Sequence, residues 1–165
     1  MSIKTEEKTT YFQLSLQTGG ISAIMNTVEC ERDNIKCRRR YFNMDIISTE
    51  KAPGAIGPYS QGFEVNGLVY TSGQIPVDPA DQTIPQGIEA QAEQSCRNVG
   101  AILEAAGSGF DKVFKTTCFL ADMDDFAAFN QVYAGYFVSK PARSCVAVKT
   151  LPKGVLCEIE AIAVK

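Results

Sequence analysis

Two segments of the chain have the periodicity of an amphipathic α-helix, and segments rich in β-forming residues lie before, between and after them. The first covers residues 86–106 and stops at Gly107, a residue that commonly follows a helix. The second covers residues 126–137, and Asp124 or Asp125 can cap its beginning. Two helices set into a series of strands favour folds in which helices pack on a sheet.

The β-forming segments are short, and turn residues separate them. Asn66-Gly67, the pair most favoured in a two-residue hairpin turn, joins residues 62–65 to residues 68–72. We expect the last two strands to pair with each other across the turn at residues 151–154. The other predicted strands cover residues 44–47, 112–120, 143–149 and 155–164.

The order β-β-β-α-β-α-β-β predicts an α+β fold, a two-layer sandwich of one mixed β-sheet with both helices on one face. The other face of the sheet then meets solvent or another subunit. Its strands keep Val, Ile, Ala and Leu on both alternations, which favours a subunit.

Residues 1–43 differ from the rest and form a predicted leader, so that the folded domain covers residues 44–165. The leader mixes polar residues with short apolar stretches and ends in a run of arginines, Arg38 to Arg40. A secretory signal is excluded because its apolar patch is too short, and acidic residues count against a transit peptide. A third interpretation is that native synthesis starts at Met44 and that the leader is poorly ordered.

Composition excludes several classes of function. The net charge of −3 and the pI of about 5.0 argue against nucleic acid as a partner. No apolar run reaches the length of a membrane span. Scattered, reduced cysteines are typical of a cytoplasmic protein, which is the location that we expect. The chain has no histidine, which excludes histidine bases and histidine metal ligands. The six cysteines contain no CxxC pair, so we predict reduced, mostly buried thiols and no metal site.

Arg143 and Cys145 stand out within the predicted strand 143–149. Side chains alternate along a strand, so these two point the same way. A guanidinium cannot lose its charge, and among apolar neighbours it needs an anion. That anion is either a carboxylate of the protein or one that belongs to a small ligand.

Glu158 and Glu160 share one face of the last strand with apolar residues. They are either solvated or lysine-paired carboxylates, or functional ones. A partly desolvated glutamate has a raised pKa, which suits it to position and polarise a water. A direct salt bridge between Glu158 and Arg143 is the competing interpretation, and it would leave no site for an anion.

Small residues and one aromatic hydroxyl mark two further segments. Tyr59 lies in a loop rich in Gly and Pro and is either an ordinary half-buried tyrosine or a ligand contact. Ser72 and Gly73 end a predicted strand, where small residues allow a ligand to approach the backbone. Ser72 is not expected to act as a nucleophile, because no histidine can take its proton.

Taken together, four separated motifs resemble the Rid/YjgF family of reactive-intermediate deaminases over residues 44–165. They are IGPYSQ (56–61), TSGQIP (71–76), PARS (141–144) and EIEAIA (158–163). The resemblance implies a chorismate-mutase-like fold and a homotrimer with clefts between subunits. It further implies hydrolysis of 2-imino or enamine acids, such as 2-iminobutanoate and 2-iminopropanoate, to 2-keto acids and ammonia, with no metal or cofactor.

The same resemblance assigns roles to individual residues. Arg143 matches the arginine that binds the substrate carboxylate through two hydrogen bonds, and Glu158 matches the glutamate assigned to the attacking water. The remaining matches are substrate-binding positions: Tyr59, Ser72, Gly73, Asn130 and Cys145.

Two other functions stay open at this point. A trimer that binds small carboxylates as a regulator, without turning them over, would use the same Arg143. Ribonuclease or translation inhibition is also attributed to family members, but the acidic chain and its lack of a basic stripe count against it.

Overall fold

The computed structural model describes residues 25–29 and 38–165, with side chains from Asn43 onward. The chain divides into two compact units, Met1–Asp45 and Ile46–Lys165. In the first unit, β1 (Met25–Glu29) pairs antiparallel with β2 (Arg38–Phe42). The other residues of the predicted leader lie outside the described part, so its order and the proposed start at Met44 stay predictions.

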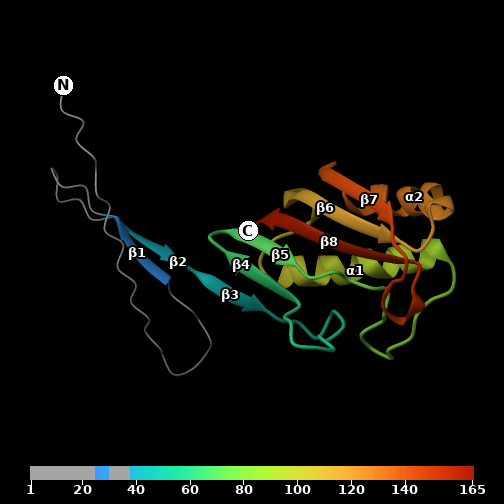
Figure 1. Cartoon of the computed structure of the whole chain (residues 1–165), viewed down its shortest axis with the longest axis horizontal. Helices are drawn as coiled ribbons and strands as arrows, with labels where there is room; N and C mark the ends of the chain where they lie inside the picture. Colours follow the sequence, from blue (N-terminus) through green and yellow to red (C-terminus); the bar gives the residue numbers. More distant parts are fainter. Residues whose placement is uncertain (1–24, 30–37) are drawn as a thin grey trace. The chain divides into compact units, whose positions relative to one another are not determined.

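Six strands form one mixed sheet in the order β3-β4-β5-β8-β6-β7 (Figure 1). The hairpin prediction is confirmed: β4 and β5 are antiparallel, and Asn66 and Gly67 between them have φ of 53° and 81°. Positive φ at both residues is what a type I′ turn requires. The strands are β3 (Met44–Ile47), β4 (Gly62–Val65), β5 (Leu68–Thr71), β6 (Val113–Leu120), β7 (Ala142–Ala147) and β8 (Cys157–Val164).

The predicted pairing of the last two strands is wrong. β7 pairs only with β6, in parallel, while β8 pairs antiparallel with both β5 and β6. The β6–α2–β7 crossover makes β7 a parallel neighbour of β6 and leaves it at the sheet edge. β8 takes the centre, because its alternate residues from Cys157 to Ala163 are almost fully buried. The strand that carries Arg143 is therefore separated from the strand that carries Glu158 by β6.

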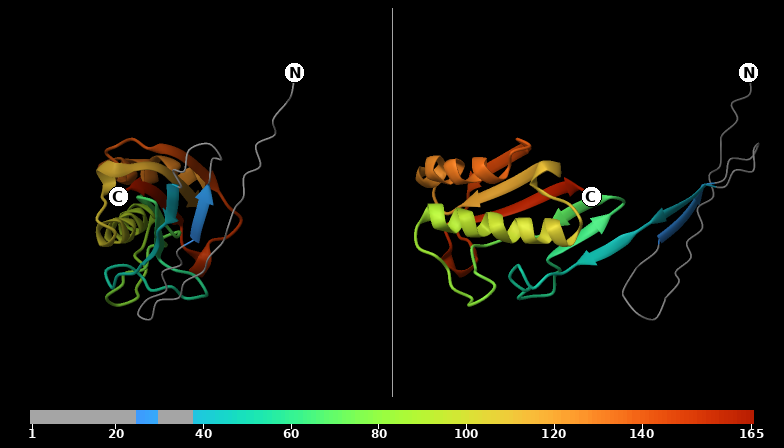
Figure 2. Two further views of the ribbon diagram at one scale, coloured as in Figure 1. Left: turned by 90° about the vertical axis from the view of Figure 1, so that its left-hand side faces the viewer. Right: turned by 180° about the vertical axis from the view of Figure 1, so that it is seen from behind.

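Helices α1 (Ile88–Ala105) and α2 (Phe126–Tyr136) pack on one face of the sheet, as predicted (Figure 2). Gly107 follows α1 with φ of 76°, a conformation that suits glycine. The expected cap of α2 is wrong: Asp125 makes no side-chain cap bond. Asp122 instead accepts a hydrogen bond from the Asp124 N–H and begins a 3-10 turn, Met123–Asp125, that leads into the helix.

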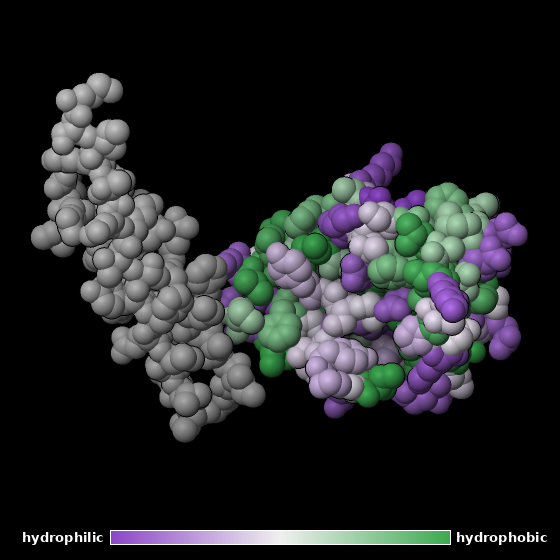
Figure 3. Space-filling model, in the orientation of Figure 1, coloured by the Kyte–Doolittle hydropathy of each residue, from purple (hydrophilic) through white to green (hydrophobic). Residues whose placement is uncertain are grey.

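The core lies between the helices and the sheet. Ile159 and Ala161 of β8 face it, together with Val99 and Ile102 of α1. Residues that alternate with these face the opposite, open side of the sheet. Figure 3 looks onto this open side and shows apolar residues mixed with polar ones. The exposed large apolar side chains on this side of the sheet include Tyr70, Val146 and Val164.

Candidate active site

Arg143 lies on edge strand β7 and points toward α2. Its Nη1 donates a hydrogen bond to Oδ1 of Asn130 at 2.7 Å. The guanidinium carbon lies 4.6 Å from the ring centroid of Tyr133 and 5.5 Å from that of Phe126. All three of these neighbours come from α2, so one helix supplies the described contacts of the guanidinium.

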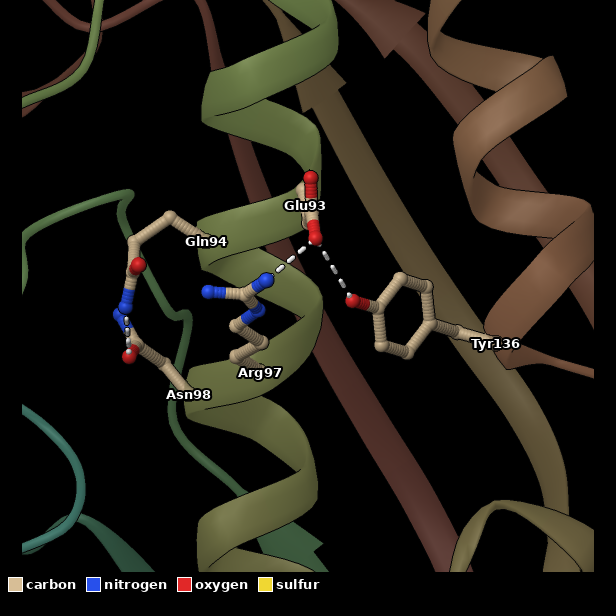
Figure 4. A network of polar contacts seen from close by, with 5 residues as sticks. All are labelled: Glu93, Gln94, Arg97, Asn98 and Tyr136. Atoms are coloured by element: carbon tan, nitrogen blue, oxygen red, sulfur yellow. Dashed lines mark hydrogen bonds and ion pairs between the residues drawn. The ribbon is translucent and has the colours of Figure 1, made fainter.

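No carboxylate of the described residues forms an ion pair with Arg143. The competing interpretation, an Arg143–Glu158 salt bridge, is therefore wrong within one chain. Arg97, on α1, shows the ordinary alternative: its Nη2 lies 2.5 Å from Oε1 of Glu93 (Figure 4). Of these two arginines, exposed Arg97 is paired with an acid on its own helix, whereas half-buried Arg143 keeps donors that no acid among residues 43–165 occupies.

Cys145 lies beside Arg143 on the same side of β7 and directly opposite Cys118 of β6. Burial raises the pKa of the Cys145 thiol, although the positive charge of Arg143 partly offsets that shift. Burial also raises the pKa of Cys118 to about 12. Both thiols therefore remain protonated at neutral pH. A protonated thiol is a poor nucleophile, so this protonation favours a binding role over a nucleophilic one for Cys145. The cysteines of residues 43–165 are all free, as the sequence predicts.

Glu158 lies on the open side of the sheet, against Gly73. A Cβ atom on Gly73 would lie only 1.8 Å from Oε1 of Glu158, so the carboxylate occupies the space that a side chain would fill. Burial raises the pKa of the Glu158 carboxyl, and the nearby negative charge of Glu160 raises it further. Glu160 itself lines a hollow of about 280 Å³ on this side of the sheet together with Lys115, without an ion pair to it. A carboxyl with a raised pKa is a suitable general base.

Buried glutamines shape the loops next to Glu158. Gln61 is 5% exposed, and its amide nitrogen donates to the carbonyls of Thr49, Ala52 and Pro53 at 2.9–3.1 Å. Its Oε1 accepts a hydrogen bond from the Thr49 N–H at 2.7 Å. Gln74 is equally buried and donates to the carbonyl of Gly73 at 3.2 Å. These bonds fix the backbone on which the candidate residues sit.

Tyr59 and Ser72 belong to the same loop region. The Ser72 hydroxyl donates to the Ser60 carbonyl at 2.6 Å, which ties the end of β5 to the loop. Tyr59 is 52% exposed and is therefore not a half-buried core residue. It lines both an open cavity of about 720 Å³, formed mainly by residues 46–61, and a small pocket of about 30 Å³ that it shares with Gly73 and Lys153.

The predicted site residues thus fall into two sets. The first set, on the α2 side of the sheet edge, contains Arg143, Asn130 and Cys145. The second set, on the open side and its loops, contains Glu158, Gly73, Ser72 and Tyr59. Cross-strand partners confirm the separation, since Arg143 is opposite buried Thr116 whereas Glu158 is opposite Phe119, on the other alternation of β6. A single chain does not bring the two sets together.

Within the described residues, no cluster of three or more acidic or cysteine side chains could hold a metal ion. Neither helix there has the length and hydropathy needed to cross a bilayer.

The sequence pattern of the family described as Endoribonuclease L-PSP matches residues 49–165. The chain belongs to this family, the Rid/YjgF family. This Rid/YjgF chain is 52% identical, over 123 residues, to the 2-iminobutanoate/2-iminopropanoate deaminase of Salmonella typhimurium, covering 72% of this chain and 96% of the relative. It is 54% identical over 122 residues to AldR of Lactococcus lactis, named as a regulator, covering 73% of this chain and 97% of the relative.

Solved structures of this Rid/YjgF family share the fold. Escherichia coli TdcF with bound serine matches with a TM-score of 0.71 and 50% identity, over 73% of this chain and 98% of that one. The family membership confirms the resemblance seen in the four motifs. The α+β arrangement of two helices on a mixed six-stranded sheet agrees with that structural neighbour.

Several residues that hold the loops of the candidate site in place were not predicted from the sequence. Gln61 and Gln74 lie inside the recognised motifs, but their burial and multiple hydrogen bonds were not predicted. Asn98 of α1 is fully buried and donates to the carbonyls of Ile75 and Val77, next to the Gly73 loop. Figure 4 shows it receiving a further bond from Gln94. A polar residue inside the apolar periodicity of a helix is the signal that could have identified Asn98.

Proposed function

We propose that this chain is a deaminase that hydrolyses 2-imino and enamine acids, such as 2-iminobutanoate and 2-iminopropanoate, to 2-keto acids and ammonia. The observation that carries the proposal is the half-buried Arg143 guanidinium, which has no carboxylate partner in the described chain. The 52% identical Salmonella relative bears the name of this activity. The proposed substrate supplies the acid group that Arg143 lacks.

In the proposed mechanism, free N–H groups of Arg143 bind the substrate carboxylate as a two-pronged pair. Glu158 accepts a proton from a water that attacks the iminium carbon, which is already electrophilic. Glu158 then returns this proton to the amine nitrogen of the carbinolamine, and the C–N bond breaks as the hydroxyl group becomes the carbonyl and gives up its proton to the departing ammonia. Overall, C=NH₂⁺ and H₂O become C=O and NH₄⁺, and Glu158 is ionised again. Positioning supplies most of the acceleration, so the reaction requires neither a metal nor a cofactor.

The other predicted residues line the proposed site. Tyr59 closes it on the loop side, while Ser72 and Gly73 form the floor beneath Glu158. Asn130 holds one prong of Arg143, and Cys145 contacts the imine nitrogen from the same strand as the arginine.

Arg143 and Glu158 lie on different sides of one sheet, so we propose that the site is shared between subunits. A chorismate-mutase-like homotrimer would place the edge strand of one chain against the open sheet face of the next. The exposed apolar side chains of that face support its burial in such an interface. Each trimer would then hold three equivalent sites.

Mixing two inactive variants tests the shared site. Arg143→Lys and Glu158→Gln are unfolded together in equal amounts and refolded, so that mixed trimers form. Each mixed trimer would contain one intact site, which predicts recovery of about a quarter of wild-type activity. A mixture as inactive as its parents would place both residues in one subunit's site, or in none.

A coupled assay tests the activity itself. A threonine or serine dehydratase generates the imine, and ammonia release or semicarbazone formation is followed with and without the protein. The proposal predicts faster ammonia release and less semicarbazone. If the protein does not change the rate of ammonia release or of semicarbazone formation, the proposed deaminase function is wrong.

A small-carboxylate-binding regulator is the second candidate, because the 54% identical AldR is named as a regulator and TdcF binds serine. Such a regulator would bind 2-keto acids through Arg143 without accelerating imine hydrolysis. Endoribonuclease activity, which the family description names, is not favoured by a chain with a net charge of −3.

A further inference from the structure

Tyr133 lies directly beneath the guanidinium of Arg143. The guanidinium carbon is 4.6 Å from the centroid of its ring, closer than to the ring of Phe126 at 5.5 Å. Tyr133 is only 7% exposed, so little solvent reaches this contact. A cation above an aromatic face is attracted by the ring quadrupole, and more strongly where water is excluded.

The ring of Tyr133 is itself held from two directions. Its hydroxyl and Oγ1 of Thr116 share a hydrogen bond of 2.7 Å. Thr116 is 1% exposed and is the cross-strand partner of Arg143. The hydrogen bond therefore connects α2 to β6 directly beside the position of Arg143 on β7. On its other side, the ring stacks on Phe137 with centroids 4.2 Å apart and planes inclined by 18°. The ring therefore has little freedom to move.

An aromatic platform solves a particular problem for a binding arginine. A half-buried guanidinium needs electrostatic compensation, and a carboxylate would supply it by occupying the N–H donors. The face of Tyr133 compensates the charge and leaves those donors unoccupied. Asn130 takes one donor of Nη1 through a neutral amide oxygen, which orients the group without neutralising it.

We infer that Tyr133 is a positioning residue: its ring, fixed by Thr116 and Phe137, keeps the Arg143 guanidinium stacked and its remaining donors aimed at a ligand carboxylate. The inference rests on the proposed function of Arg143 as the carboxylate-binding residue. Burial also raises the pKa of Tyr133 to about 12, so its hydroxyl stays neutral beside the guanidinium.

Two substitutions separate the ring from the hydroxyl. Tyr133→Leu removes the ring, and Tyr133→Phe keeps it but loses the bond to Thr116. Because the cation–π attraction is lost with the ring, Tyr133→Leu should raise KM for the imine, and Kd for 2-oxobutanoate, by about 10-fold. We expect kcat to change less than about threefold. Tyr133→Phe should stay within about threefold of wild type on both constants, because its ring keeps the stack on Phe137 that holds it under the guanidinium.

Tyr136→Leu is the matched control, because Tyr136 lies on the same helix and contacts Glu93 and Phe110 instead of Arg143. It should lower the melting temperature without raising KM. Equal KM values in wild type and Tyr133→Leu, or an equal rise in Tyr133→Phe, would overturn the inference. If neither Tyr133→Leu nor Tyr133→Met, which has a longer and more flexible side chain, folds, Tyr133 is a core residue and the inference is wrong.

Titration with 2-oxobutanoate separates failure of this inference from failure of the proposed function. If wild type binds 2-oxobutanoate but does not hydrolyse imines, the deaminase proposal fails while Tyr133 remains testable through Kd. If Arg143→Lys binds the keto acid as well as wild type, the carboxylate-binding role of Arg143 fails, and the role of Tyr133 fails with it.

Discussion

The charged residues on the two sides of the sheet have different electrostatic surroundings. On the helix side, Arg143 is stacked on aromatic rings, and a single hydrogen bond orients it. On the open side, Glu158 lies against a glycine with a second carboxylate nearby, and both burial and repulsion disfavour its charge. The arginine is stabilised as a cation, whereas the glutamate is destabilised as an anion.

This difference matches what each residue would have to do. A carboxylate-binding cation works best when its charge is permanent and its donors are unoccupied. A general base works best when its ionised form is destabilised, because the raised pKa then favours transfer of a proton to it. Neither charge neutralises the other, because the fold separates them by β6.

The largest expected effect comes from removing the fork on the helix side. Arg143→Lys keeps the charge but loses the planar pair of donors and the stacking surface. Loss of two charged hydrogen bonds, at about 1.5–3 kcal/mol each, should lower kcat/KM by about 10³-fold. Steady-state kinetics on the imine measure it, with Arg97→Lys, an exposed arginine on α1, as the control. Near-native turnover in Arg143→Lys would contradict the proposed role.

On the open side, the expected effect is smaller and falls on a different constant. Glu158→Gln keeps the shape of the side chain but cannot take a proton, so kcat should fall by about 10²-fold. Binding of 2-oxobutanoate should persist, since the carboxylate-binding residue is untouched. Glu160→Gln, two residues along the same strand, is the matched control and should keep kcat within about threefold. Loss of keto-acid binding in Glu158→Gln would mean that both sides serve binding.

Gly73→Ala changes the placement of Glu158 without changing its chemistry. The added methyl group would overlap the Glu158 carboxylate, which has to rotate away. A misplaced base predicts a fall in kcat of about 10-fold with a small change in KM. Gly135→Ala is the control, because a Cβ there meets nothing within 4 Å. Wild-type kcat in Gly73→Ala would show that the position of the carboxylate is not critical.

Local patterns predicted the elements well, because each depends on nearby residues. The turn at Asn66-Gly67 and the end of α1 at Gly107 follow from residues that accept positive φ. The burial of alternate residues in β8 likewise follows from its composition. Strand order could not be predicted this way. Whether β8 pairs with β7 or inserts beside β5 depends on the energies of whole-sheet packing.

The candidate site shows the same limit. Motifs identified Arg143 and Glu158, but only the sheet order reveals that they lie on different sides. The pairing of Arg143 with Asn130 follows from the β6–α2–β7 crossover, which stacks the helix over the edge strand. Nothing in the local sequence distinguishes Tyr133 from an ordinary core residue. Its proposed positioning role depends on β7, which places Arg143 over its ring.

The smallest expected effect is a shift in pH dependence that again separates the two sides. The pKa of Glu158 is raised above its ordinary value by burial first and by Glu160 second. If the ionised carboxylate is the base, kcat should rise with pH through that raised pKa, and Glu160→Gln should move the rise to lower pH. If kcat rises over the same pH range in Glu160→Gln as in wild type, another group controls the pH dependence.

The pH dependence of thermal stability provides an independent test of the difference between Arg143 and Glu158. Because the folded-state pKa of Glu158 is raised, the folded chain holds this proton more tightly than the unfolded chain. Stability therefore falls as pH rises from the unfolded pKa to the folded one, and at neutral pH the ionised carboxylate destabilises the fold. Glu158→Gln should thus melt at a higher temperature than wild type at pH 7, with the difference vanishing below the ordinary glutamate pKa. Arg143→Lys keeps its charge over this range and should show no such pH-dependent gain, so a matching gain there would remove the contrast between the two sides.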